Sequence, residues 1–249
     1  MISVPTFEKT HEILRDTITE LTEQKKLKTL PSRLYHYTSL ETVKHIFFSD
    51  DIRLSHAEYS NDRLEMEHAK IIIRETLALQ QNSAFHVQVL QNFDTIAATL
   101  DAYIFCMSEG SSRTKPQDVL SQWRAYGQDG RGACIELNPT HFATLTDHIP
   151  GLRVNPIIYD PIVQQQLVDG ILARGHTDWI NNLANQGQSV DAAVAALVFV
   201  TPLMKVEGFD EEREWRLIFA PPPINPQPDY EFHPRRDFLA PFVTLNLDR

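Results

Sequence analysis

The sequence is poor in cysteine and has no excess of positive charge. Only Cys106 and Cys134 occur among 249 residues, with no CxxC pair, so no disulfide framework is indicated and a reducing cytoplasm is the expected compartment. The formal net charge is -10 and the pI is about 5.4. This balance argues against a generally basic nucleic-acid surface but leaves room for a local basic cleft.

Long hydrophobic runs are also missing. The first residues carry acids and lack the apolar segment of a secretory signal. The longest apolar run, residues 192–204, is interrupted by Pro202 and falls short of the ~20 residues that cross a bilayer. We therefore interpret it as a buried helix and expect a soluble protein with no membrane partner. At 42% hydrophobic residues, the chain can bury a real core.

The apolar periodicity predicts helices that alternate irregularly with short strands. Helices are expected over residues 7–28, 62–82, 84–100, 161–182 and 189–206, with two more that begin after Ser39 and at Pro116. Strands are expected over residues 34–38, 52–54, 103–107, 133–137, 154–159, 213–220 and 242–247. This irregular order favours an α+β fold, with a mixed, mainly antiparallel central sheet and helical insertions, over a doubly wound fold.

The expected domain organisation is simple. Residues 1–30 are predicted to form a helical extension, and residues 31–249 a single α+β domain with a helical insert at about 160–207. The spacing also predicts which side chains face inward. They are Leu40, Val43, Ile46, Phe47, Leu64, Ile71, Ile72, Leu79, Val119, Leu120, Trp123 and Tyr126.

Two polar residues end the first predicted strand. His36 and Thr38 are two residues apart, so their side chains share one face, opposite Tyr35 and Tyr37. A lone histidine is more often a structural one that is hydrogen-bonded to the backbone. Here, however, a helix N-terminus follows at Ser39, and such a terminus favours anionic groups such as phosphate. His36 is therefore a candidate ligand-binding residue.

An acidic group follows the second predicted strand. Asn61, Asp62 and Glu65 could form an acidic site, but Asp62 followed three residues later by Glu65 also resembles a capping box, which is the favoured interpretation. Further along, Trp123 and Tyr126 are spaced as core residues, whereas Arg124 is free to pair with a carboxylate or phosphate.

The sharpest signal is the segment from Glu212 to Phe219. If it is a strand, Trp215, Leu217 and Phe219 share the core face. Glu212, Glu214 and Arg216 then share the other face. Adjacent carboxylates repel, so the pKa of one should rise unless a cation such as Arg216 intervenes. A salt-bridged solvent face is the ordinary explanation of such a pattern, and a cleft wall is the functional one.

Several of these segments together resemble the bacterial domain-of-unknown-function family DUF2971. The resemblance runs, in order, through LYHYTS from Leu34, YSNDRLE from Tyr59, FCMS from Phe105, LSQWRAYGQDGRGACIEL from Leu120, VNPIIYD, and Lys205 with EEREWRLI. The helix before Pro31 lies outside it. The family name implies no biochemical activity.

A more distant resemblance does imply an activity. A strand that ends in His-x-Thr, a helix with an apolar face and a late strand with Glu-x-Glu are similar to the NAD-using ADP-ribosyltransferases, which have a split sheet. The resemblance makes His36 and Thr38 binders of the NAD ribose, Glu214 the catalytic acid and Glu212 an assistant to the acceptor nucleophile. For the middle residue of the family's triad, Ser55, Tyr59 and Ser108 compete.

We therefore expect a cytoplasmic enzyme that consumes NAD as its substrate, either a transferase or a glycohydrolase, acting as a toxin or antiviral defence effector. Arg124 could bind the pyrophosphate, and Tyr37 or Trp123 could stack on nicotinamide. The macromolecular acceptor, protein or nucleic acid, stays open. The alternatives are a non-catalytic ligand-sensing or interaction domain and a metal-dependent nuclease that uses Asp62, Glu65 and Glu214.

Overall fold

A computed structural model of the chain describes most of its length. The described residues are 3–59, 63–80, 83–110, 119–223, 229–234 and 238–247, with the backbone alone for residues 63–65. The helices are α1 (Val4–Glu23), α2 (Leu40–Ser49), α3 (Arg63–Leu79), α4 (Ala84–Ala97), α5 (Leu120–Ala125), α6 (Pro139–His148), α7 (Pro161–Asn181) and α8 (Gln186–Val200). The strands are β1 (Leu34–Thr38), β2 (Asp51–His56), β3 (Tyr103–Ser108), β4 (Ala133–Leu137), β5 (Leu152–Pro156), β6 (Glu214–Phe219), β7 (Glu231–Pro234) and β8 (Leu239–Asn246).

The strands form one sheet that divides at β3. Its main path runs β4-β1-β3-β2-β8-β7, and β6 pairs with both β3 and β5. All six residues of β3 pair with β6 along one edge. On the other edge, Ser108 pairs with β1, whereas Tyr103 and Ile104 pair with β2. These pairings are antiparallel, so the expected α+β fold with a mainly antiparallel sheet is confirmed.

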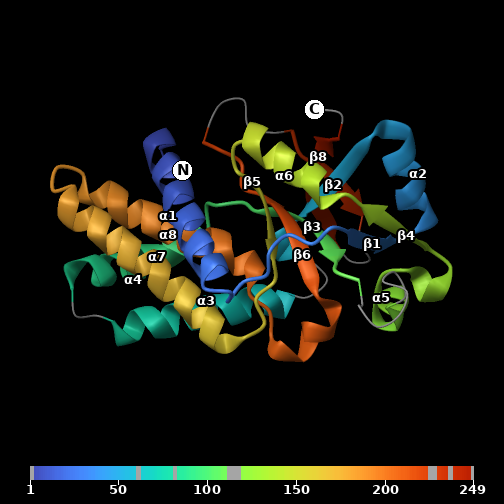
Figure 1. The fold of residues 1–249 in the computed structure, drawn as a ribbon. Coiled ribbons are helices and arrows are strands. Elements are labelled where there is room, and N and C mark those ends of the chain that lie inside the picture. Colours follow the sequence, from blue (N-terminus) through green and yellow to red (C-terminus); the bar gives the residue numbers. More distant parts are fainter. Residues whose placement is uncertain are drawn as a thin grey trace.

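Helices cover the two faces of this sheet unequally. Helices α1, α3, α4, α7 and α8 gather on one side of the molecule, and α2, α5 and α6 lie around the strands on the other (Figure 1). The larger core lies between the first group and the sheet, where it includes Ile104 and Ile218. The smaller core lies on the opposite sheet face and contains Trp215 and Leu217. Strand β6 is therefore buried on both faces.

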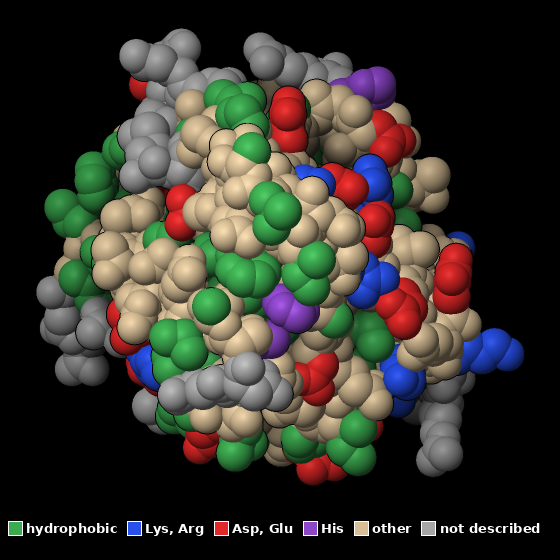
Figure 2. Space-filling view, turned by 90° about the vertical axis from the view of Figure 1, so that its left-hand side faces the viewer, with side chains coloured by type: hydrophobic (Ala, Val, Ile, Leu, Met, Phe, Trp, Pro, Cys, Tyr) green, Lys and Arg blue, Asp and Glu red, His purple; other side chains and the backbone are tan. Residues whose placement is uncertain are grey.

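The helical side is built around α8. Every side chain from Ala192 to Val200 in this helix is buried, as expected for the longest apolar run of the sequence. Helices α1, α4 and α7 all pack against it. On the outer surface of this side, Figure 2 shows hydrophobic side chains on one part and interspersed acidic and basic side chains on another. No helix among the described residues is long and apolar enough to cross a membrane.

The periodicity located most elements but misjudged several faces. In α2 only Ile46 is buried, whereas Leu40 is 60% and Phe47 69% exposed. In α3, Ile71 and Leu79 are exposed, and Met66, Ala69, Ile73 and Leu77 supply the buried face instead. The side chain of Leu64 lies outside the described residues. The short helices η4 (Glu207–Glu212) and α6, and strand β7, were not predicted.

One glycine is required where α6 turns into β5. Gly151 has a φ of +87°, and a Cβ placed on it would lie 2.0 Å from the carbonyl oxygen of Ala220. That approach allows the amide of Ala220 to donate to the Gly151 carbonyl over 2.9 Å at the end of β6. Both the conformation and the space therefore demand glycine.

We expect Gly151→Ala to destabilise the protein by more than the ~1–2 kcal/mol of a positive φ alone, because the new methyl group meets rigid backbone. Gly130→Ala is the matched control, since Gly130 also has a positive φ, +81°, but nothing lies within 4 Å of its Cβ position. Urea unfolding of both variants measures the difference. Equal losses of unfolding free energy in the two variants would show that the backbone at Ala220 moves away from the new methyl group at no cost.

Candidate functional site

A small enclosed cavity marks the place where β1, β3, α5 and the start of β6 meet. Its volume is about 50 Å³. The residues that line it are Tyr35, His36, Tyr37, Cys106, Met107, Ser108, Gln122, Tyr126, Glu212 and Glu214. Three of them, His36, Glu212 and Glu214, are sequence-predicted catalytic residues, so the structure brings these three to one cavity.

The register of the sheet places one row of polar side chains beside the cavity. Glu136 pairs with Tyr35, Tyr35 with Ser108, and Ser108 with Glu214. Residues paired across strands project to the same face, so these four side chains share one face of the sheet. Strand β3 therefore lies between β1 and β6, which are not direct neighbours.

Glu214 is the centre of a buried ion-pair cluster. Its Oε1 accepts from Nε of Arg216 over 2.6 Å, and its Oε2 accepts from Nη2 of Arg216 over 3.0 Å. The same Oε2 lies 3.3 Å from Nζ of Lys205. Nη1 of Arg216 donates to the carbonyl of Pro202 over 2.8 Å. The sequence analysis anticipated a salt bridge of the Glu214 carboxylate on a solvent-exposed strand face, but the structure buries this salt bridge.

The second carboxylate reaches the cluster from outside the strand. Glu212 ends η4, and Arg213 then turns the chain with a φ of +44°. Lys205 bridges the two acids, because its Nζ also lies 2.5 Å from Oε2 of Glu212. The exposed fraction of the four charged side chains is at most 14%. The charges of two acidic and two basic side chains thus balance in a region with little exposure to solvent.

The cations decide the ionisation of Glu214. Burial by itself raises the pKa of this carboxyl, but the charge and hydrogen bonds of Arg216, followed by the charge of Lys205, bring the pKa below its ordinary value. The repulsion between the two acids is therefore overcome by a cation, as the sequence analysis anticipated for Arg216. Glu214 is ionised at neutral pH.

Helix α5 supplies the outer wall. Gln122 and Tyr126 are four residues apart, so both project from one side of this helix toward the cavity. Tyr126 is 38% exposed. Partial burial, together with the negative charge of Glu212, raises its pKa, so the phenol stays protonated and can donate a hydrogen bond. The inward face that we predicted for this helix is wrong for Leu120 and Tyr126, which are exposed.

His36 borders the cavity but packs on the other face of the sheet. It pairs with Ile135, which contacts the smaller core, and its ring stacks on Phe105 with 4.2 Å between the ring centroids. Nδ1 donates to the carbonyl of Cys106 over 2.8 Å, because a carbonyl oxygen only accepts. Burial lowers the pKa of the imidazole to about 4, although the bond to Cys106 opposes this shift. His36 is neutral at pH 7.

Of the other predicted cofactor-binding residues, Tyr37 lines the cavity, whereas Thr38, Trp123 and Arg124 do not. Tyr37 is buried, its hydroxyl accepts from the amide of Val119, and its ring meets Trp123 edge-on at 5.2 Å. Trp123 and Arg124 line a separate, open hollow of about 380 Å³ on α5. Thr38 is buried at the end of β1, where it pairs with Ala133.

The structure separates the three candidates for the middle residue of a triad. Ser108 borders the cavity and pairs with Glu214. Ser55 lies in β2, paired with Phe242, and Tyr59 contacts His56 and Phe238 instead. Neither of them lines the cavity. Asn61 and Asp62, and the side chain of Glu65, lie outside the described residues.

Sequence reasoning did not assign a role to Tyr35, Gln122, Tyr126 or Lys205. The sequence analysis placed Tyr35 on the strand face opposite His36. Through its pairing with Ser108, Tyr35 therefore lies on the same sheet face as Glu214. Lys205 was noted only within the family resemblance. Its distances of seven and nine residues before the two acids give no signal by themselves, because η4 folds the chain back between Lys205 and the acids. The short helix η3 (Thr201–Leu203) comes before Lys205.

The fold and site define an α+β protein with a buried carboxylate–cation cluster on a divided antiparallel sheet. Residues 122–217 match the model of the family described as "Protein of unknown function (DUF2971)", which confirms the family resemblance over this segment. The segment begins at Gln122 and contains Lys205, Glu212, Glu214 and Arg216, so it includes all four charged residues of the cluster. Neither the curated proteins nor the solved structures contain a significant match to the chain.

We expect Glu214→Gln to destabilise the protein by about 3–5 kcal/mol, because it leaves Arg216 and Lys205 as buried charges without a full partner. Glu136→Gln is the matched control. Glu136 belongs to the same row and also pairs with an arginine, Arg33, but this pair is exposed and its loss should cost little. Urea unfolding at pH 7 compares the two variants, and equal losses would contradict a buried cluster.

The lowered pKa of His36 predicts acid sensitivity. The unfolded chain takes up the proton near pH 6.5, whereas the folded protein takes it up only near pH 4. Because the unfolded state binds more protons between these values, the free energy of unfolding should fall as the pH drops from about 6.5 to about 4. His36→Asn, which can still donate to Cys106, should make this fall shallower in urea titrations at several pH values. An unchanged slope would mean that His36 titrates normally.

Proposed function

We propose that this chain is an NAD-consuming enzyme of the ADP-ribosyltransferase type, which cleaves the bond between nicotinamide and ribose and passes ADP-ribose to an acceptor or to water. One observation carries the proposal: an ionised carboxylate, Glu214, borders a small cavity that is also lined by a second carboxylate and by hydroxyl donors. The distant resemblance of the Glu-x-Glu strand supports the same activity.

The chemistry needs a fixed negative charge. When the glycosidic bond to nicotinamide breaks, positive charge develops on the ribose, and a preorganised carboxylate in a water-poor site stabilises it. Glu214 meets this requirement because Arg216 holds its carboxylate in place through two hydrogen bonds. Glu212 contacts Lys205 and is the more exposed of the two acids, which suits it to assist an acceptor.

The size of the cavity limits what can enter it. A volume of about 50 Å³ holds one or two water molecules, so NAD does not fit inside as a whole. The proposal places only the reacting ribose end at the cavity, after movement of the partly exposed Tyr126. The phosphates then extend along α5, where Arg124 lines the larger hollow and Trp123 or Tyr37 offers an aromatic ring for stacking.

In the cell, such an enzyme would act in the cytoplasm as a toxin or an antiviral defence effector. Depletion of NAD, or modification of a protein or nucleic acid, would each stop growth. In this proposal His36 binds a ribose hydroxyl through Nε2, which is left as an acceptor because Nδ1 carries the proton. Since its ring packs on the sheet face opposite Glu214, this role requires the ring to turn toward the cavity that it borders.

A second candidate is a non-catalytic ligand-sensing or interaction domain. The observation that favours it is the saturation of Glu214, whose two carboxylate oxygens are both occupied by Arg216 and Lys205. In this case the cluster joins β6 to η3 and η4, and the cavity is a packing defect beside it.

Release of free nicotinamide from NAD distinguishes the two candidates. The wild-type protein should release it in a chromatographic assay. Glu214→Asp keeps the charge but withdraws it by one methylene group, so turnover should fall by roughly 10²-fold. Turnover is compared at equal amounts of folded protein, because the shorter side chain also loosens the buried cluster. Glu212→Gln should reduce transfer to an acceptor more than hydrolysis. If the wild-type protein releases no nicotinamide with water, protein extract or nucleic acid as acceptor, the enzyme proposal fails.

A matched pair of arginines tests the path of NAD along α5. Arg124→Gln should raise the KM for NAD and leave kcat unchanged, because a phosphate contact acts on binding. Arg131→Gln is the control, since Arg131 is equally exposed nearby but does not line the hollow. Equal effects of the two variants would indicate a general effect of charge.

A further inference from the structure

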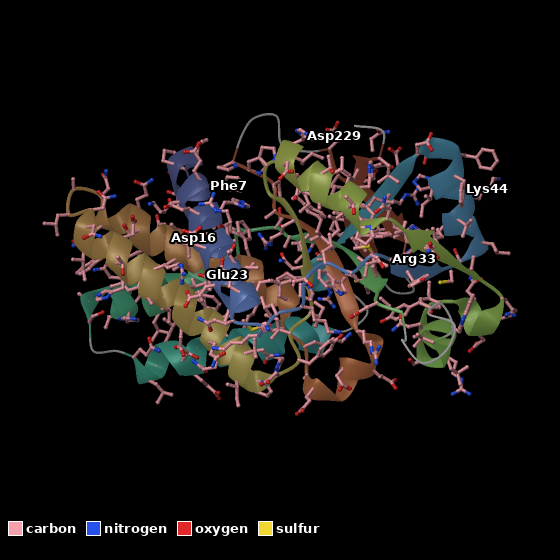
Figure 3. All side chains as sticks on the ribbon, in the orientation of Figure 1. Phe7, Asp16, Glu23, Arg33, Lys44 and Asp229 are labelled. Carbon is pink, nitrogen blue, oxygen red and sulfur yellow. The ribbon has the colours of Figure 1, made fainter. Side chains whose placement is uncertain are left out.

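A large, open cavity lies away from the proposed active site. Its volume is about 760 Å³, within the range of small-molecule sites. Its walls are α1, the end of α6 and β5, and it shares no lining residue with the cavity beside Glu214. Phe7, labelled in Figure 3, borders it from α1, and the far edge of this ring approaches Gly151 at the start of β5.

Three polar side chains that line this cavity contain buried atoms without a hydrogen-bond partner among the described residues. They are Nε and Nη1 of Arg153, Oδ1 of Asn155 and Nε2 of His11. Arg153 and Asn155 are two residues apart in β5, so their side chains share one face, and His11 reaches the cavity from α1. Native proteins leave few buried polar atoms unpaired, so their convergence at one cavity indicates a missing partner.

The arginine is the strongest of these observations. Nη2 of Arg153 donates to the carbonyl of Phe199 near the end of α8, which accounts for one of its three nitrogens. No carboxylate of a described residue forms an ion pair with it. Arg216, by contrast, is fully buried and has partners for Nε, Nη1 and Nη2. Burial lowers the pKa of Arg153 to about 10, so the side chain still carries its charge at neutral pH.

The surroundings limit the charge of the partner. Glu8, Glu12 and Asp147 line the cavity together with only one further cation, Arg15. A polyanion would be repelled by these three acids, whereas a molecule with one anionic group can place it on Arg153. The acids and Oδ1 of Asn155 then favour a hydrogen-bond donor, such as an ammonium or hydroxyl group, elsewhere in the same molecule.

We propose that this cavity binds a small molecule with one carboxylate or phosphate group and with a donor group. Because Nε and Nη1 of Arg153 and Oδ1 of Asn155 are closed to solvent in the free protein, the two side chains turn toward the cavity on binding. The anionic group then accepts hydrogen bonds from Arg153, and the donor group faces Asn155 and the acidic wall. The proposal does not depend on NAD cleavage. A volume of about 760 Å³ admits a ligand the size of an amino acid or a larger metabolite of the same polarity.

Titration with small probes at constant ionic strength tests this proposal. Acetate, inorganic phosphate and glycine represent a carboxylate alone, a phosphate and a carboxylate with an ammonium group. We expect a saturable shift of the Arg153 Nε–H signal in nuclear magnetic resonance spectra and a higher Tm, with glycine binding more tightly than acetate. A preference for phosphate over both would identify a phosphate ligand.

Two variants separate binding from folding. Arg153→Met replaces the unpaired donors by an apolar chain of similar length, so the ligand-free protein should stay folded and the Kd for the tightest probe should rise roughly ten- to hundredfold. Asn155→Leu should weaken the binding of glycine but not that of acetate, and it gives an answer even if Arg153→Met does not fold. Arg33→Met, at an exposed arginine on the opposite side of the molecule, is the control.

Two results would overturn the proposal. One is the absence of a saturable response to any of the three probes in the wild-type protein. The other is a response that Arg153→Met, or Asn155→Leu for glycine, leaves as strong as in Arg33→Met. Either result would mean that Arg153 is buried only to hold the end of α8 through Phe199.

Discussion

The pairing of Arg216 with Glu214 is the constraint on which the centre of the molecule depends. Both side chains lie on a strand that is buried on its two faces, so neither charge can reach bulk water. Desolvation of two ions is costly unless their remaining donors and acceptors are satisfied. Pro202 and Lys205 meet this requirement from the segment that follows α8. The cluster therefore fixes the position of the helical side relative to the sheet.

Hydrophobic pattern was sufficient to find most helices and strands, but not to orient them. The apolar runs of β3 and α8 are continuous, so no choice of face was needed and the prediction held. Helices α2 and α3 carry apolar residues on more than one side. Their spacing shows a helix, whereas the choice between Ile71 and Ile73 as the buried residue depends on where the neighbouring helices lie. That information is tertiary and is absent from a local pattern.

The same limit applies to the candidate site. Alternation along one strand correctly predicted that Glu214 and Arg216 share a face, because it depends only on the pleat. The partners of Glu214 across the sheet depend on register, and one residue of slip exchanges Tyr35 for His36. The second cation of the cluster is Lys205. It reaches the two acids because the chain folds tightly between Lys205 and Glu212, and no regular spacing in the sequence indicates this.

The half-buried Arg153 and the buried Arg216 differ in a way that separates structural from ligand-binding roles. Arg153 donates to the carbonyl of Phe199 at the end of α8, and Arg216 donates to that of Pro202 just beyond it, where the helix dipole favours a cation. Arg216 also has a carboxylate and is complete without any ligand. Arg153 has none, so part of its hydrogen-bonding capacity is unused in the free protein. By the same logic, a ligand of Glu214 must compete with Arg216 and Lys205 for its oxygens, whereas a ligand of Arg153 finds two nitrogens that have no competing partner among the described residues once the side chain turns toward it.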